Sequence, residues 1–170
     1  MQEDSTRLFV ALWPDPPLQR RLRSERDAWH WPPGARPVAD ASLHLTLHFL
    51  GAFARQRVAV LESALAAQPV TTTTLRASGR EIWRGGIAVL LFTTEPALSA
   101  LHGKLGAALA ALDVALDPRP FSPHVTLARR ARGAVPPGEP ADLAWRARGF
   151  ALVESGRGGA YRVLRVFGDG

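Results

Sequence analysis

The sequence predicts an α+β fold with a largely antiparallel sheet. Strand-like and helix-like segments are interspersed without a regular βαβ series, and no phosphate loop of the GxGxxG or GxxxxGK[ST] type is present. Hydrophobic residues make up 46% of the chain and charged residues 21%, which is typical of a soluble globular protein. The length of 170 residues favours one domain, or two small lobes that share a core.

Apolar periodicity predicts the elements, and proline and glycine predict many of their ends. Pro14 stops the first apolar run, Pro16 can open the first helix, and Gly51 is expected to end the second strand. The β-branched threonines at 71–74 fit an edge strand. In chain order we expect strand 7–13, helix 18–29, loop 31–40, strand 43–50, helix 55–67, strands 70–77 and 87–93, helix 96–112, strand 124–128, and final strands 145–154 and 160–167.

The charge of the chain is strongly positive and comes almost entirely from arginine. The net charge is +6, and Lys104 is the only lysine. Arginine suits phosphate groups because its planar fork donates two parallel hydrogen bonds, and a basic surface attracts polyanions. A genome of biased base composition is the alternative explanation for this arginine content.

The composition also limits the cellular setting. With no cysteine, the chain has neither disulfides nor thiolate metal ligands. No window approaches the roughly 18 consecutive apolar residues that span a bilayer. The polar segment 1–7 lacks the basic and apolar regions of a signal peptide. We therefore expect a cytoplasmic protein that does not contact membranes.

Two short segments share one pattern, His-x-Thr between apolar residues. They are Leu43-His44-Leu45-Thr46-Leu47 and Pro123-His124-Val125-Thr126-Leu127. Side chains alternate across a strand, so each histidine shares a face with its threonine while the apolar residues lie on the other face. The histidines are 80 positions apart, near half the chain length, as expected for two duplicated lobes. One such pattern arises often by chance, but two in matching apolar frames indicate a function.

Phosphodiester hydrolysis explains why two copies would be needed. The attacking water must lose a proton, and the leaving oxygen on the opposite side of phosphorus must gain one. Histidine has an ordinary pKa of roughly 6.5, so one imidazole can be neutral while its partner is protonated near pH 7. Threonine hydroxyls can donate to the non-bridging oxygens as negative charge builds there. The pattern therefore favours acid–base catalysis without a metal or cofactor.

Longer stretches around both motifs extend this interpretation. They comprise 7–11 (RLFVA), 43–51 (LHLTLHFLG), 119–129 (RPFSPHVTLAR), and the closing segment 152–155 (LVES) with Tyr161. In this order and spacing, the chain resembles the RNA 2′,3′-cyclic phosphodiesterases, also called 2′–5′ RNA ligases, of the two-histidine (2H) phosphoesterase superfamily. Two long motifs make the resemblance specific.

The resemblance implies a bilobal α+β fold in which two pseudo-symmetric lobes line a central groove with their sheets and carry helices outside. It implies that residues 1–170 form a single bilobal domain, and we expect a monomer. The implied reaction is hydrolysis of RNA 2′,3′-cyclic phosphate ends to 2′-phosphate ends, together with reversible 2′–5′ RNA ligation. The implied partner is RNA with either of these ends.

The family also implies residue roles, which the near-symmetry of the motifs does not reveal. His44 is the implied proton donor to the leaving 3′-oxygen, and His124 the acceptor that activates water. Thr46 and Thr126 are implied to bind the phosphoryl oxygens. No metal site is expected.

Arg129 and Phe49 are less direct matches. Arg129 resembles a phosphate contact of the family, and Phe49 an aromatic position that can stack on a base. Strict alternation places both on the faces opposite the histidines, so a bulge or twist must turn them, or they reach the groove from its edges. The alternatives are core packing for Phe49 and an ordinary surface role for Arg129.

Further candidate residues stand apart from the motif pairs. His48 follows His44 by four positions, but the strand-like alternation and the lack of an HExxH glutamate argue against zinc. On a regular strand, His48 would share the face of His44 and line the groove. His102 lies in a leucine-striped helix, where a solvated or boundary position is expected. Trp83, near Arg80 and Arg84, fits either an RNA-facing patch or ordinary packing.

Two alternative functions remain open. One is a phosphodiesterase for a small cyclic nucleotide or cyclic phosphate. The other is a non-catalytic protein that binds RNA ends on the same scaffold. The gain in kcat/KM with RNA length, and turnover in EDTA, distinguish them from the RNA enzyme.

Overall fold

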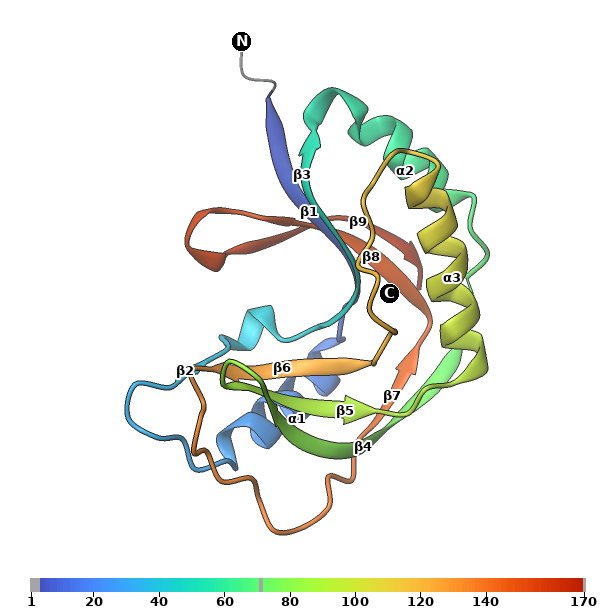
Figure 1. Cartoon of the computed structure of the whole chain (residues 1–170). Coiled ribbons are helices and arrows are strands. Elements are labelled where there is room, and N and C mark those ends of the chain that lie inside the picture. The colour runs from blue at the N-terminus through green and yellow to red at the C-terminus, as the bar shows by residue number, and fades with distance from the viewer. Residues whose placement is uncertain (1–3, 71, 170) are drawn as a thin grey trace.

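Two antiparallel sheets form the framework of the molecule (Figure 1). The computed structural model describes residues 4–70 and 72–169 and confirms the predicted α+β class. The first sheet has the strand order β3-β1-β8-β9, and the second has the order β2-β6-β5-β4-β7. The strands are β1 (Ser5–Leu12), β2 (Arg36–Pro37), β3 (Leu45–Ala54), β4 (Thr73–Trp83), β5 (Ile87–Phe92), β6 (His124–Arg129), β7 (Ala144–Ala147), β8 (Gly149–Ser155) and β9 (Tyr161–Gly168).

The α-helices lie on different sheets. Helix α1 (Pro16–Asp27) packs behind the second sheet, where the Glu25 carboxylate accepts a 3.0 Å hydrogen bond from Arg80 of β4. Helices α2 (Val58–Ala66) and α3 (Pro96–Ala110) pack on each other and against β9 and β3 of the first sheet (Figure 1). Three 3₁₀ turns complete the assigned helices: η1 (Asp40–Ser42), η2 (Arg55–Arg57) and η3 (Arg157–Gly159).

One hydrophobic core joins both sheets to these helices. It contains leucines of β1, α1 and α3 together with Leu90 of β5 and Val125 of β6. A smaller cluster, Phe9, Ala11, Ala151 and Val153, lies on the other face of the first sheet, with Trp13, Tyr161 and Val163 packed against it. The first sheet therefore buries one face in the main core and carries an aromatic cluster on the other.

Several strand boundaries differ from the expectation. β3 continues beyond Gly51, whose φ of +69° accommodates a bulge opposite Leu8 rather than ending the strand. A two-residue strand, β2, lies in the predicted loop 31–40 and pairs with β6. β4 is an interior strand of the second sheet, pairing with β5 along 77–83 and with β7 along 73–76, so Thr73 and Thr74 pair with β7 and not with β5. Of the threonines predicted to lie at an edge, Thr71 is outside the described residues.

The predicted strand 145–154 is two strands in different sheets, β7 and β8. The chain passes from one sheet to the other next to Gly149. A Cβ at Gly149 would collide with the Phe167 carbonyl oxygen of β9, so only glycine allows this close approach. Within residues 4–70 and 72–169, the structure contains no helix with the length and apolar character needed to cross a bilayer.

Candidate active site

Both His-x-Thr segments contain a β-bulge directly after the threonine. Along β1 and β3, Ala11 pairs with Thr46 and Val10 pairs with His48, which leaves Leu47 as an extra residue. Along β5 and β6, Val89 pairs with Thr126 and Ala88 pairs with Ala128, which leaves Leu127 as the extra residue. An extra residue reverses the alternation of every side chain that follows it.

The bulges bring Phe49 and Arg129 onto the faces of the threonines. Phe49 pairs with Phe9, which lies on the same face as Ala11 and therefore as Thr46. Arg129 follows Ala128, which faces the core, and so it projects on the side of Thr126. Of the two routes that the sequence left open for these residues, a bulge or an approach from the edge, the structure has the bulge in both strands. We call His44, Thr46 and Phe49 the first motif face, and His124, Thr126 and Arg129 the second motif face.

The same bulge removes His48 from the first motif face. Its neighbour across the strands is Val10 of the main core, and its side chain is buried against α3. The His48 Nε2 atom lies 2.8 Å from the backbone carbonyl oxygen of His102. The predicted position of His48 beside His44 was therefore wrong, because the bulge at Leu47 reverses the alternation.

A backbone carbonyl orients each motif histidine. His44 Nδ1 lies 2.7 Å from the Ser42 carbonyl oxygen, and His124 Nδ1 lies 2.7 Å from the Ser122 carbonyl oxygen. Because a carbonyl only accepts, both Nδ1 atoms carry a proton. In the neutral rings Nε2 is then the free base. In His44 this atom lies 2.9 Å from Thr46 Oγ1.

Aromatic side chains surround the His44 ring. Trp13 stacks on it with ring centroids 5.4 Å apart, and Phe9 and Tyr161 lie at centroid distances of 4.9 and 5.3 Å. Burial is the main reason that the pKa of His44 falls from 6.5 to about 4. The Ser42 carbonyl opposes this fall, and the positive charges of His124 and Arg129 add to it. The strands that carry the two motifs, β3 and β6, contact each other.

His124 lies in a less enclosed setting. The Trp83 ring meets the His124 ring edge-on at a centroid distance of 4.3 Å, and Trp83 Nε1 donates a 2.6 Å hydrogen bond to Glu81. Burial lowers the pKa of His124, the Ser122 carbonyl raises it, and the charge of Arg119 lowers it. Both histidines therefore favour the neutral form in the free protein.

The family model for the 2′-5′ RNA ligase superfamily matches residues 14–158, which include both motif faces. This chain belongs to that superfamily. A curated relative, the RNA 2′,3′-cyclic phosphodiesterase of Escherichia coli K12, is 38% identical over 144 residues, which span 78% of each chain. The crystal structure of E. coli LigT in its apo form superposes with a TM-score of 0.82 at 30% identity and covers 98% of each chain. LigT complexed with 3′-AMP superposes with a TM-score of 0.82 at 27% identity, over 97% of this chain and 98% of LigT.

Sequence reasoning missed part of the site in this 2′-5′ RNA ligase superfamily member. Phe9 and Trp13 were assigned only to a buried strand. With Ala11 they occupy every second position, and so they lie on one face of β1 and its extension. That spacing places both on one face, but only the pairing of β1 with β3 brings them beside His44. Tyr161 had been noted only as part of a closing strand. Trp83 contacts the His124 ring, which neither of its two interpretations had specified.

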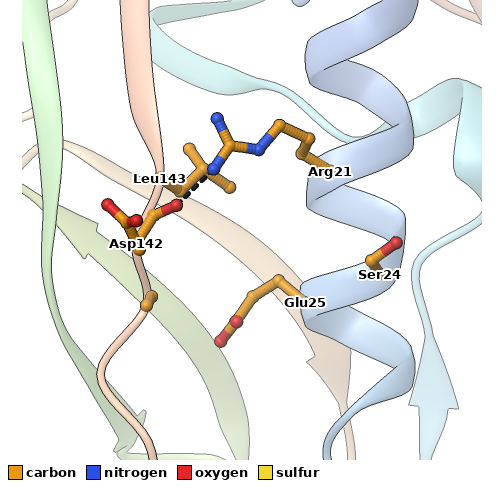
Figure 2. A pocket seen from close by; sticks show the side chains of 6 residues that line it. Arg21, Ser24, Glu25, Asp142 and Leu143 are labelled. Carbon is orange, nitrogen blue, oxygen red and sulfur yellow. Dashed lines mark hydrogen bonds between the residues drawn. The ribbon is translucent and has the colours of Figure 1, made fainter.

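One pocket of this superfamily member lies away from the motif faces. It has a volume of about 390 Å³ and lies between α1 and residues 141–143 (Figure 2). Its lining residue Arg21 is bonded to the Asp142 carbonyl, and Glu25 is paired with Arg80 behind the second sheet. Across residues 4–70 and 72–169, no group of three His, Asp or Glu side chains is arranged to hold a metal ion.

The lowered histidine pKa values predict a loss of stability in acid. The pKa is about 4 for both His44 and His102, against 6.5 for an ordinary histidine, so the unfolded chain binds more protons between these values. The contribution of these histidines to the free energy of unfolding is therefore greatest above about pH 6.5, and it falls as the pH drops towards 4. We expect the Tm to decline between pH 7 and pH 5, less steeply in His102→Phe. An unchanged slope in that variant, with His30→Ala as control, would contradict the expectation.

Proposed function

We propose that this chain hydrolyses RNA 2′,3′-cyclic phosphate ends to 2′-phosphate ends through proton transfers at His44 and His124. The observation that carries the proposal is the matched pair of Nε2 atoms. Each belongs to a ring whose Nδ1–H is held 2.7 Å from a carbonyl, and the strands of the two motifs, β3 and β6, contact each other. The name of the E. coli relative supports the same reaction class.

In the proposed mechanism His124 Nε2 removes a proton from the attacking water. Its neutral form, which burial favours, is the form that a general base requires. His44 Nε2 delivers a proton to the leaving 3′-oxygen. The anionic phosphate of the substrate beside His44 raises its pKa from about 4, because a nearby negative charge stabilises the imidazolium. Substrate binding thus creates the acid that the reaction needs.

Threonine and arginine side chains complete the proposed site. The Thr46 and Thr126 hydroxyls lie beside their histidines on the motif faces and would donate to the non-bridging phosphoryl oxygens. The Arg129 guanidinium would contribute charge-assisted hydrogen bonds to the same group. The proposed proton transfers involve no metal ion.

Phe49 would stack on the base of the terminal nucleotide. Its side chain is 65% exposed, and its ring centroid lies 6.1 Å from that of Phe9. Base–aromatic stacking stabilises binding by about 1–3 kcal/mol per base, so Phe49→Ala is expected to raise KM on the order of tenfold. Phe49→Tyr should retain most of the affinity, and neither change should lower the Tm appreciably. An unchanged KM in Phe49→Ala would show that Phe49 does not hold the base.

The decisive assay uses an oligoribonucleotide with a 2′,3′-cyclic phosphate end and a nucleoside 2′,3′-cyclic phosphate in parallel. In EDTA, both should open to a 2′-phosphate, with a higher kcat/KM for the oligonucleotide that declines at high salt. Equal kcat/KM values at all salt concentrations would indicate an enzyme for small cyclic phosphates. Binding without turnover would indicate a non-catalytic RNA-end binder. A 3′-phosphate product would contradict the proposed protonation of the 3′-oxygen.

A further inference from the structure

The ring of His102, on α3, lies between two aromatic rings that adjoin the two His-x-Thr segments. On one side it stacks on His48 of β3, with centroids 4.0 Å apart and planes inclined by 21°. On the other side it stacks on Phe121, at 4.0 Å and 11°. Phe121 belongs to the loop that leads into β6. The sandwich His48–His102–Phe121 therefore connects the first His-x-Thr segment to the second through α3.

A hydrogen bond holds the first side of this sandwich to the β3 bulge. His48 Nε2 lies 2.8 Å from the His102 carbonyl oxygen, and the Leu47 carbonyl raises the pKa of His102. Leu47 is the extra residue that turns Phe49 onto the first motif face. Gly106, one helical turn after His102, leaves room for the His48 ring, because a Cβ there would lie 3.2 Å from His48 Cε1.

The second side of the sandwich adjoins the carbonyl that orients His124. Phe121 immediately precedes Ser122, whose carbonyl oxygen accepts from His124 Nδ1. On its other side, Ser122 is followed by Pro123, whose carbonyl accepts a 3.0 Å hydrogen bond from the Phe92 amide. Ser122 is thus fixed between a stacked ring and a strand hydrogen bond.

In the first motif, a helical turn fixes the carbonyl that orients the histidine. Ser42, whose carbonyl orients His44, closes the turn η1 with a 2.9 Å hydrogen bond to Ala39. The turn is tied to α1 by Arg26, which pairs with Asp40 at 2.7 Å. In the part of the chain that the structure describes, the loop before His124 has no comparable helical turn. The stacking of Phe121 on His102 fixes this loop instead.

We propose that His102 is a positioning residue that, through Phe121, holds the Ser122 carbonyl on His124 and, through His48, holds the β3 bulge that presents Phe49. The inference rests on the proposed function for its effect on turnover, but its effect on the His124 ring is independent of any substrate. A misplaced reacting group can lower a rate by on the order of 10²-fold, so a partial loosening of this loop should be measurable in kcat.

The test compares Phe121→Ala and His102→Ala with the parent protein, and follows the His124 ring by NMR titration without substrate. The Ser122 carbonyl raises the pKa of His124, so its loss should move that pKa further down. We expect this shift in both variants, together with a roughly tenfold lower kcat for a nucleoside 2′,3′-cyclic phosphate. His102→Phe, which keeps a flat ring in the sandwich, should retain the His124 pKa and most of the kcat.

His30→Ala is the matched control, because His30 is an exposed histidine outside the sandwich and should change neither readout. Phe121 is a half-buried loop residue, so Phe121→Ala decides the question if His102→Ala does not fold. The proposal is overturned if folded Phe121→Ala keeps the parental His124 pKa, or if kcat falls only in proportion to the unfolded fraction. Because the titration needs no turnover, a failure of the proposed hydrolysis leaves this test intact.

Discussion

Replacing His44 or His124 with glutamine is expected to lower the kcat for cyclic phosphate opening by on the order of 10²–10⁴-fold. Each ring is held by a carbonyl so that its Nε2 atom is available to the substrate, and glutamine cannot exchange a proton at that place. Initial rates on a nucleoside 2′,3′-cyclic phosphate would measure the loss. Circular dichroism and Tm should show that both variants remain folded.

The double histidine variant gives a stricter check on this prediction. When two groups act in one proton-transfer mechanism, the effects of removing them on kcat are not additive. The double variant should therefore have a kcat little lower than that of either single variant. A variant of either histidine that keeps more than about a tenth of the parental kcat would contradict the assigned role, because general acid–base catalysis supplies at least about 10²-fold.

Replacing Thr126 or Thr46 with valine is expected to lower kcat by about 10²-fold each, because loss of one donor to a developing oxyanion has an effect of this size. Valine retains the shape and β-branching of threonine, so the strands should be preserved. Serine at either position keeps the hydroxyl and should restore most of the rate. The measurement is kcat at saturating cyclic nucleotide.

The two threonines should differ in one respect. Thr46 Oγ1 lies 2.9 Å from His44 Nε2, so Thr46→Val also changes the hydrogen bonding of that ring. An altered pH dependence is therefore expected for Thr46→Val and not for Thr126→Val. If both valine variants retained the parental kcat while the histidine variants lost activity, the threonines would not bind the phosphoryl group.

The sequence predicted the α+β class and the two motifs, because apolar alternation and the repeated His-x-Thr pattern are local signals. It did not predict where Phe49, His48 and Arg129 point. Each of these residues follows a bulge, and a bulge depends on which residue of the neighbouring strand opposes it. A single strand read alone cannot reveal that register.

Longer-range features escaped prediction for a similar reason. The stretch 145–154 was predicted as one strand, yet it serves two sheets, because Gly149 allows a close approach to β9. The sandwich around His102 brings together a helix, a bulge and a loop that are far apart in the sequence. Such contacts are properties of the tertiary structure.

The most direct test of the central claim is the pH dependence of kcat for EDTA-treated protein on a nucleoside 2′,3′-cyclic phosphate. Two histidines acting as base and acid predict a bell-shaped pH profile of kcat. The kcat rises as His124 loses its proton, and it falls at higher pH as His44 in the substrate complex loses its proton. His124→Gln should abolish the acidic limb, and His44→Gln the alkaline limb. A flat profile that survives both substitutions, or activity that EDTA removes and a divalent metal restores, would contradict the account.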